Sequence, residues 1–327
     1  MRPPGGAPVT SRTVAAIDCG TNSIRLLICD LDPERSRLTD LAREMRIVRL
    51  GEGVDHTGRL APAALDRTMA ALGEYAEMIS RLAPGALRAQ AVRMVATSAT
   101  RDAENSQEFT RRVKEVLGIT PEVVTGQEEA RLSFTGATGE LGGAFAPYLV
   151  SDIGGGSTEL VLGDASGVRG GRSVNIGCVR MTERHLHSDP PTPGEVAAAT
   201  ADIEAALDDA ARGNFGAGQP AGRARTLIGL AGSVTTVAAI ALGLAQYDSQ
   251  RIHHSRVSAA QVHDICLRLL GQTRAQRAAI GAMHPGRVDV IGAGALILDR
   301  IVAKYEFDEV LVSEHDILDG IAWSLAT

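Results

Sequence analysis

Residues 151–162, which read SDIGGGSTELVL, place three consecutive glycines between two short apolar segments. The segments Tyr148–Ile153 and Leu160–Leu162 are bounded by turn residues, a pattern typical of β-strands. Glycines in the connecting turn tolerate positive φ angles and leave backbone N–H groups exposed, which creates a concave site for anions. A dinucleotide-binding fingerprint requires a helix directly after its glycines, whereas a second strand follows here. We therefore predict a hairpin that holds a phosphate in its turn, and not a flexible Gly/Ser linker.

The same pattern occurs once more near the N-terminus, where residues 18–29 read DCGTNSIRLLIC. Both segments contain D-x-G-x-x-S-x-x-L in a strand–turn–strand setting, at one constant offset. We infer two halves with the same core, whose hairpins face each other across a cleft between domains. The matched positions are Asp18 with Asp152, Gly20 with Gly154, Ser23 with Ser157, and Leu26 with Leu160.

The length and composition predict a globular α/β protein of about two domains. A chain of 327 residues can bury a sizeable core, and 44% hydrophobic with 22% charged residues excludes a disordered chain. The net charge of −6 argues against broad nucleic-acid binding, and no apolar run reaches membrane-spanning length. Four scattered cysteines, without a C-x-x-C motif or a secretory segment, predict reduced thiols in a cytoplasmic protein.

Composition and periodicity also predict the order of the elements. We expect residues 1–12 to form a loose Pro/Gly-rich tail, residues 13–126 domain I and residues 127–313 domain II. The C-terminal helix at 314–327 is expected to pack back on domain I. Helices are predicted at 62–80, 105–117, 195–211, 231–242, 258–270, 288–304 and 317–325, strands at 38–48, 92–97, 120–124, 172–179, 225–230 and 309–313, and a glycine-rich loop at 212–223.

Two further turns carry polar residues at the ends of predicted strands. Arg101 follows the buried strand at 92–97, on the carboxyl side where α/β sheets place ligands. A purely structural role fits this position equally well. Gly232 and Ser233 lie in a turn that opens a helix, which predicts either a phosphate or nucleotide site or a tight helix cap.

Two adjacent glutamates, Glu128 and Glu129, lie in the first turn of a helix that opens at Gly126. Acidic residues at this position also complement the helix dipole, so the pair alone does not establish a catalytic site. Consecutive helical residues point about a third of a turn apart, so only one of the two readily faces a given cleft.

Histidines suggest a metal at three places, and we reject all three. His253 and His254 are adjacent loop residues without a third ligand spaced nearby, and we interpret them as solvated. The His-Asp dipeptides at 263–264 and 315–316 look like those of HD metal-phosphohydrolases, but the partner His and Asp residues are missing.

Several segments resemble, in order along nearly the whole chain, the exopolyphosphatase and guanosine-pentaphosphate phosphohydrolase (Ppx/GppA) family of the actin-like and sugar-kinase ATPase superfamily. The combination of G-x-E-E-A-R-L at 126–132 with D-I-G-G-G-S-T-E at 152–159 is specific for the family. The two hairpins alone indicate only the superfamily. Further matching segments are 18–23, 98–101, 175–180, 229–235 and 285–298. Some members carry an additional C-terminal HD-type domain, and this chain resembles the short form without it.

The resemblance implies two ribonuclease-H-like domains around a cleft and removal of a terminal phosphate from inorganic polyphosphate. It assigns Glu129 as the catalytic base on water and Arg101 as a phosphate-binding catalytic residue. It assigns Asp152, Glu159 and Glu128 to a divalent metal, Mg²⁺ or Mn²⁺. The residues expected to bind phosphate are Gly20, Thr21, Asn22, Ser23, Arg25, Gly154, Gly155, Gly156, Ser157 and Thr158. Gly232 and Ser233 are expected on the nucleotide side of the site, and the protein is expected to be a homodimer.

Two positions depart from the family pattern. Leu318 stands where many relatives carry an arginine before an acidic-Gly pair, here Asp319-Gly320, so any contact of that arginine is lost. Gly232-Ser233 replaces the usual Gly-Thr near the nucleotide-side turn.

Three other functions are alternatives to the exopolyphosphatase. A guanosine pentaphosphate phosphohydrolase, acting on penta- or tetraphosphate, would use the same site. A sugar-kinase-like or actin-like ATPase would need a full adenosine site. A sensor of polyphosphate or alarmone is expected to lack the acidic residues that this chain keeps.

Overall fold

The computed structural model describes the chain except for residues 1–11, 35–36, 87–90, 142, 213–223 and 327. Most of the predicted tail and of the glycine-rich loop at 212–223 therefore lie outside the described residues. The first half contains strands β1 (Arg12–Cys19), β2 (Ser23–Asp32), β3 (Arg37–Ile47), β4 (Val92–Ala96) and β5 (Glu122–Val123). They form a sheet in the order β3-β2-β1-β4-β5. β1, β2 and β3 are antiparallel neighbours, whereas β4 and β5 run parallel to β1.

The second half repeats this topology. Its strands are β6 (Tyr148–Ile153), β7 (Thr158–Asp164), β8 (Gly167–Val174), β9 (Thr226–Leu230), β10 (Arg256–Ser258) and β11 (Glu309–Val312). The sheet order is β10-β11-β9-β6-β7-β8. Strands β6, β7, β8, β9 and β11 have the same order and directions as β1 to β5, and β10 adds an antiparallel edge. The two halves therefore have the same core, as the repeated hairpin pattern predicts, and this core is the ribonuclease-H-like one that the family resemblance implies.

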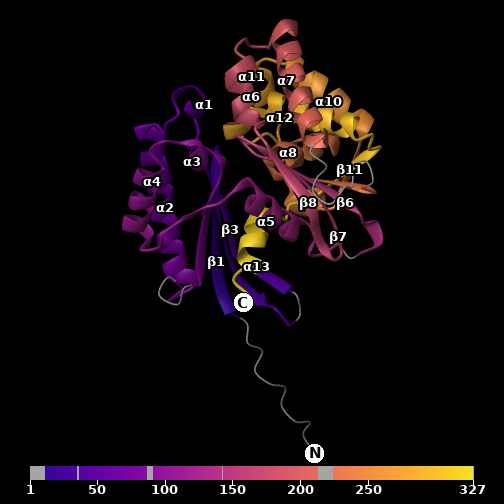
Figure 1. Cartoon of the computed structure of the whole chain (residues 1–327). Helices are drawn as coiled ribbons and strands as arrows, with labels where there is room; N and C mark the ends of the chain where they lie inside the picture. The colour runs from indigo at the N-terminus through magenta and orange to yellow at the C-terminus, as the bar shows by residue number, and fades with distance from the viewer. Residues whose placement is uncertain (1–11, 35–36, 87–90, 142, 213–223, 327) are drawn as a thin grey trace, which may run out of the picture.

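The helices lie on both faces of each sheet (Figure 1). In the first half they are α1 (Val54–Thr57), α2 (Pro62–Leu82), α3 (Ser98–Asp102) and α4 (Ser106–Leu117). In the second half they are α6 (Cys178–His185), α7 (Pro193–Arg212), α8 (Ala231–Ala241), α9 (Ser249–Ile252), α10 (Ala259–Gly271), α11 (Arg274–Ala278) and α12 (Ile291–Lys304). Between the sheets lie α5 (Gly126–Thr138) and α13 (Ile317–Trp323). No helix in the described part of the chain is long and apolar enough to cross a membrane.

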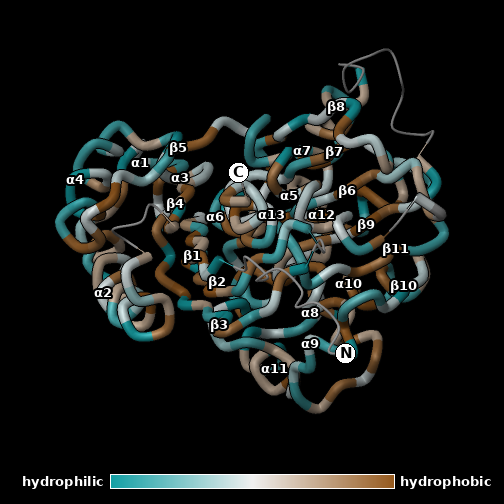
Figure 2. The backbone as a smooth tube through the Cα atoms, turned by 90° about the horizontal axis from the view of Figure 1, so that it is seen from below, coloured by the Kyte–Doolittle hydropathy of each residue, from teal (hydrophilic) through white to brown (hydrophobic). Residues whose placement is uncertain are grey.

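Each sheet has its own hydrophobic core. Ile17 and Leu27 of the first sheet are fully buried in one cluster, which also contains Ile321 of the C-terminal helix α13. Leu149 and Ile297 belong to a separate cluster in the second half. In Figure 2 the brown, hydrophobic stretches follow the central strands of both halves. The four cysteines are buried and unpaired, which confirms the prediction of free thiols.

Helices α5 and α13 cross with their backbones in contact. A Cβ atom on Gly136 of α5 would lie 1.8 Å from the carbonyl oxygen of Asp316. A Cβ atom on Gly320 of α13 would lie 2.0 Å from the carbonyl oxygen of Leu132. Because α5 leads from the first sheet into the second and α13 returns from it, this crossing joins the two halves at the base of the cleft.

Two predicted boundaries are wrong. The strand expected at 172–179 ends at Val174, and helix α6 begins at Cys178, because the first N–H groups of that helix find acceptors in the glycine turn at 154–156. Arg12, assigned to the loose tail, belongs to β1, where it pairs with Leu31 of β2. The short helices α1, α3, α9 and α11 are additional elements without a sequence prediction.

Candidate active site

A cavity of about 90 Å³ lies between the two glycine turns. Residues of both halves line it, together with one glutamate of α5 at the base of the cleft. The predicted site residues among them are Gly20, Thr21, Asn22, Ser23, Arg25, Glu129, Asp152, Gly154, Gly155, Ser157, Glu159, Gly232 and Ser233. The two hairpins thus face each other, as the sequence predicts.

The two turns touch each other in this structure. A Cβ atom on Gly155 would lie 2.8 Å from Cβ of Thr21, and one on Gly156 would lie 2.7 Å from Oγ of Ser98. The hydroxyls of Thr21 and Ser98 are themselves hydrogen bonded at 2.9 Å. The second turn therefore needs glycine not only for its backbone shape but because the opposite hairpin occupies the space of a side chain.

In the first hairpin, Asp18 is paired with Arg25. The guanidinium donates to one oxygen of Asp18 through Nε (3.0 Å) and Nη2 (2.6 Å), and it also forms an ion pair with Asp316. The second oxygen of Asp18, Oδ1, is buried and has no hydrogen-bond partner in the described part of the chain. Burial raises the pKa of Asp18, although Arg25 opposes this rise.

In the second hairpin, Asp152 and Glu159 are opposite each other in the β6–β7 ladder. Asp152 accepts a hydrogen bond from the hydroxyl of Ser133 (2.6 Å), and Glu159 accepts one from Ser173 (2.7 Å). Burial raises the pKa of Asp152 to about 6, with a further contribution from the charge of Asp316. Burial also raises the pKa of Glu159 well above its usual value, and the nearby carboxylates add to the effect.

Glu129 reaches the cavity because of how α5 begins. The hydroxyl of Thr125 caps the helix by accepting the N–H of Glu128, and a Cβ atom on Gly126 would lie 2.4 Å from Cβ of Ser173. Glu129 is buried and accepts a hydrogen bond from Nη1 of Arg101 at 3.0 Å. Burial raises the pKa of Glu129 to about 7, whereas the charge of Arg101 lowers it.

The carboxylates at this site fit a hard divalent cation. Asp152, Glu159 and Glu129 are buried near one another, and burial together with the charge of neighbouring carboxylates raises their pKa values, a rise that a bound cation would oppose. The unpartnered Oδ1 of Asp18 adds a further oxygen at the same cavity. Carboxylate oxygens are the ligands that Mg²⁺ and similar cations take from proteins.

Two predicted site residues face away from the cavity. Glu128, predicted as a metal ligand, instead pairs with Arg131 at 2.7 Å on the outer side of α5, because it is rotated by about 100° from Glu129. Thr158, predicted to bind phosphate, is fully buried and donates to the carbonyl of Ile176.

Two other predicted residues lie beside the cavity rather than in its lining. Gly156 turns its carbonyl oxygen to Arg180, which donates through Nε at 2.7 Å. Arg101, predicted to bind phosphate directly, contacts Glu129 and the carbonyl of Val124, both at 3.0 Å.

Three residues of the site were not predicted from the sequence. Asp18 has a sequence signal, since it matches Asp152 in the repeated pattern. Asp316 was dismissed as part of a chance His-Asp dipeptide, yet it is buried and paired with Arg25. Arg287 lines the cavity and donates to the carbonyl of Gly232 at 2.8 Å. A Cβ atom on Gly232 would lie 2.0 Å from Cζ of Arg287, so this glycine makes room for the guanidinium.

Arg287 differs from Arg25, which also lines the cavity, in its ion pairs. It forms no ion pair with any carboxylate in the described ranges, and burial lowers its pKa. An arginine in such a position provides a cation for an anionic ligand.

A second cavity of about 430 Å³ adjoins the first and shares Arg25, Gly232 and Arg287 with it. Its other walls are more apolar than the lining of the first cavity. They include Met45, Tyr247, Ala282, Met283, Pro285 and Leu318.

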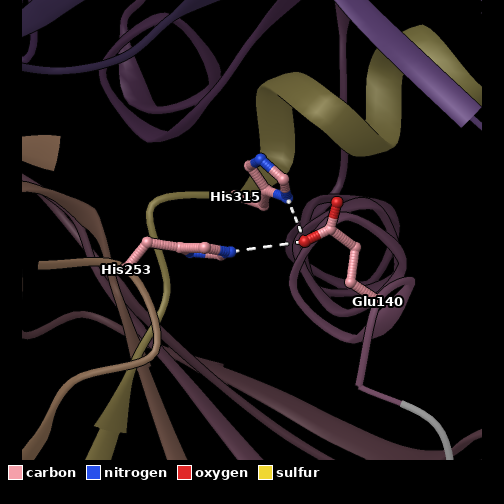
Figure 3. A group of neighbouring side chains, drawn as sticks. All are labelled: Glu140, His253 and His315. Carbon is pink, nitrogen blue, oxygen red and sulfur yellow. Dashed lines mark hydrogen bonds and ion pairs between the residues drawn. The ribbon is translucent and has the colours of Figure 1, made fainter. Parts of the chain in front are cut away.

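Glu140, His253 and His315 form a separate cluster (Figure 3). Glu140 follows helix α5, His253 follows α9 and His315 precedes α13. The ring atoms His253 Nε2 and His315 Nδ1 lie 3.3 Å and 3.5 Å from Oε2 of Glu140. Nδ1 of His253 accepts the backbone N–H of Glu314, so the neutral ring carries its proton on Nε2, the atom that faces Glu140. The geometry is therefore that of a hydrogen-bonded cluster rather than of metal ligands. His253 is partly buried in this cluster, in contrast to the solvated position expected for it.

Two glycine turns, buried carboxylates and a base candidate meet at one cavity, an arrangement suited to the hydrolysis of a phosphoanhydride. The model of the Ppx/GppA phosphatase family matches residues 28–327, and the chain belongs to this family.

Individual relatives agree with this assignment. The chain is 52% identical over 324 residues to exopolyphosphatase 2 of Mycobacterium tuberculosis, covering 96% of this chain and 98% of the relative. It is 28% identical to a guanosine-5'-triphosphate,3'-diphosphate pyrophosphatase of Aeromonas salmonicida, covering 95% of this chain but 59% of that protein. A crystal structure of an exopolyphosphatase-like protein has 43% identity and a TM-score of 0.88, covering 96% of this chain and 97% of that one.

Proposed function

We propose that this protein is an exopolyphosphatase that releases terminal orthophosphate from inorganic polyphosphate by attack of water. The observation that carries the proposal is Glu129, a buried carboxylate with a pKa near 7 at the cavity between two phosphate-binding turns. The similarity to a relative named exopolyphosphatase over nearly the whole of both chains supports it.

Both walls of the cavity contribute to phosphate binding. The backbone N–H groups of Gly155 and Gly156 and the cations Arg25 and Arg287 bind phosphate oxygens from several sides. A phosphoanhydride needs little covalent help from the protein, so positioning and charge stabilisation account for most of the rate.

Glu129 orients the attacking water and accepts its proton. A base is most effective when its pKa lies near the working pH, and burial places Glu129 there. Arg101 holds the carboxylate through one oxygen, which leaves the other free to face the water. Glu128 has no part in this step, because it pairs with Arg131 outside the cavity.

We propose Mg²⁺ as the cofactor, with Asp152 and Glu159 as its protein ligands and Asp18 as a third oxygen donor. When bound, the cation neutralises charge on the phosphate oxygens that develops as the bond to the leaving phosphate breaks. Mg²⁺ fills the rest of its shell with water and phosphate oxygens, so two or three protein carboxylates suffice.

Guanosine pentaphosphate is the second candidate substrate, and the adjoining cavity favours it. That cavity has apolar walls beside three arginines, Arg25, Arg43 and Arg287, a combination that accommodates a nucleoside next to phosphates. Leu318, which stands where many relatives carry arginine, contributes to the apolar wall. A relative named for guanosine pentaphosphate cleavage belongs to the same family.

One side-by-side assay distinguishes the candidates. Phosphate release is measured with Mg²⁺ from long polyphosphate, short polyphosphate, guanosine pentaphosphate and ATP. The proposal expects the highest kcat/KM on polyphosphate, and preference for guanosine pentaphosphate would replace it with the second candidate. Release from ATP alone would favour an ATPase.

Sedimentation and fractionation would test the expectation of a cytoplasmic homodimer.

A further inference from the structure

The first turn of helix α6 is hydrogen bonded to the glycine turn at 154–156. The backbone N–H groups of Cys178 and Val179 donate to the carbonyl oxygens of Gly154 and Gly155, both at 2.9 Å. The N–H of Arg180 also donates to Gly155, at 3.1 Å. These carbonyls therefore point toward the helix, whereas the N–H groups of Gly155 and Gly156 donate to no residue that the structure describes.

The close approach of α6 to the turn depends on glycine. A Cβ atom on Gly177 would lie 2.3 Å from the carbonyl oxygen of Gly155. A side chain at this position would push the helix and the turn apart. The position of the turn is thus determined by the position of α6.

The side chain of Arg180 extends from the same helix to the opposite half of the molecule. Its Nε donates to the carbonyl of Gly156 at 2.7 Å, which fixes the last glycine of the turn. Its Nη1 and Nη2 form ion pairs with Asp55 of α1 and Asp102 of α3, the latter at 2.7 Å. The arginine is only 13% exposed, and the two carboxylates are 16% and 33% exposed.

Neighbouring residues of α6 contact the first half without touching the turn. Glu183 accepts the backbone N–H of Gly53 at 3.2 Å. Arg184 pairs with Asp55 at 3.1 Å and with Asp202 of its own half at 2.8 Å. Arg180 therefore differs from Arg184 in its bond to the turn and in its ion pair with Asp102.

The carboxylate partners of Arg180 lie on two helices of the first half. Figure 1 shows α1 at the end of the first half that is remote from the crossing of α5 and α13, whereas α3 lies nearer to it, with Arg101 of α3 hydrogen bonded to Glu129 of α5. If the halves separate about that crossing, the ion pairs of Arg180 with Asp55 and Asp102 break, together with the contacts of Glu183 and Arg184. The bond to Gly156 lies within the second half, and the two carboxylates hold the guanidinium in the position from which it donates.

We propose that Arg180 is a positioning residue that couples closure of the two halves to the geometry of the phosphate-binding turn. In this structure one guanidinium binds both carboxylates of the first half and the carbonyl of Gly156, so contact between the halves holds Gly156 in its catalytic position. The proposal rests on the proposed phosphatase function, since it concerns the same site. A displacement of about 1 Å at a reacting centre can lower the rate on the order of 10²-fold.

The test compares Arg180→Gln with the matched control Arg184→Gln. Both variants remove a cation that pairs with Asp55 from the same helix, but only Arg180→Gln removes the bond to the turn and the ion pair with Asp102. We expect Arg180→Gln to lower kcat on polyphosphate by about 10- to 100-fold, with a smaller change in KM. Arg184→Gln should stay within about threefold of the wild type, because it lacks the bond to the turn. Equal losses in both variants, or an Arg180→Gln enzyme with wild-type kcat, would overturn the proposal.

A double-mutant cycle with Asp102→Asn separates coupling from loss of stability. Asp102→Asn removes a partner in the first half and leaves the turn untouched. If closure acts through Arg180, Asp102→Asn lowers kcat in the wild-type background but adds nothing in the Arg180→Gln background. Additive losses would contradict coupling. Thermal unfolding of each variant shows whether a loss merely follows unfolding.

Binding of inorganic phosphate, measured by calorimetry, keeps this test separate from the substrate assignment. If no polyphosphate is cleaved by the wild type, the proposed function fails, but the coupling still predicts weaker phosphate binding in Arg180→Gln than in Arg184→Gln. Equal phosphate affinities in the two variants would exclude the coupling whatever the substrate is.

Discussion

The two hairpins at the cleft share one sequence pattern and one topology, yet their aspartates have different surroundings. Asp18 of the first hairpin accepts two hydrogen bonds from Arg25, at 3.0 and 2.6 Å. Asp152 of the second accepts a neutral hydroxyl, that of Ser133, at 2.6 Å, and lies opposite Glu159. The duplicated core places one aspartate on each side of the cleft. The residues packed around each aspartate decide whether it is paired with a positive charge. The aspartate of the first wall is therefore paired with a cation of the protein itself, whereas that of the second wall has only a neutral hydroxyl as its hydrogen-bond donor among the described residues.

The largest effect is expected from loss of the proposed catalytic base, Glu129. Glu129→Gln preserves size and hydrogen bonding but removes proton acceptance, so kcat should fall by roughly 10²–10⁴-fold. Affinity for polyphosphate should stay the same or improve, since a negative charge facing a polyanion is lost. Glu128→Gln is the matched control and should be mild, because Glu128 pairs with Arg131 outside the cavity. Steady-state kinetics at saturating Mg²⁺ measure both, and an inactive Glu128→Gln with an active Glu129→Gln would reverse the roles.

The next prediction compares the two aspartates directly. Asp152→Asn should raise the Mg²⁺ concentration for half-maximal activity by about 10-fold or more, and Glu159→Gln should have a smaller effect. Asp18→Asn should change the Mg²⁺ requirement less than Asp152→Asn, because one oxygen of Asp18 is already occupied by Arg25. Titration of activity against Mg²⁺ provides the measurement. Unchanged Mg²⁺ dependence in Asp152→Asn and Glu159→Gln would remove both from the metal site.

Replacement of Arg101 tests how far its positive charge lowers the pKa of Glu129. The base must be deprotonated to act, and the charge of Arg101 lowers its raised pKa, so Arg101→Ala should move the acid limb of the kcat–pH profile upward by about one unit or more. Activity lost near pH 7 should then return at higher pH, which loss of folding would not produce. If Arg101 also contacts substrate, KM rises by an amount that corresponds to about 2–5 kcal/mol for a desolvated contact. An unchanged profile and KM would leave Arg101 with a structural role.

The smallest expected effect concerns stability. Glu129, Asp152 and Glu159 have folded-state pKa values above their usual ones, so their contribution to the free energy of unfolding is complete at low pH and is lost as the pH rises through about 6 to 7. A bound cation offsets this loss only where the carboxylates are ionised. Mg²⁺ at about 100 times its Kd should therefore add about 2–3 kcal/mol at pH 8 and far less at pH 5. Thermal unfolding with and without Mg²⁺ at both pH values checks this, and equal gains would place the cation elsewhere.

Predictions from the sequence succeeded where the signal is local. The glycine turns are bracketed by apolar strands, and the helix after Gly126 carries its own cap, so the hairpins and α5 could be located from neighbouring residues. Helix α6 was missed because its first turn is stabilised by carbonyls of Gly154 and Gly155, more than twenty residues earlier in the chain. A pattern of side chains does not encode such a distant acceptor.

The sequence by itself determined the duplicated core, the facing turns and the set of acidic residues, because strand periodicity and glycine turns act over a few residues, and the family resemblance added that the core is ribonuclease-H-like. Only the tertiary structure decided which of these residues share the cavity. Asp316 meets Arg25 across 291 positions, and Arg287 meets Gly232 across 55, because sheet order and the α5–α13 crossing bring these segments together. The structure also turned Glu128 toward Arg131 and Arg101 toward Glu129. Ion pairs depend on distance through space, which is set by packing and not by spacing along the chain.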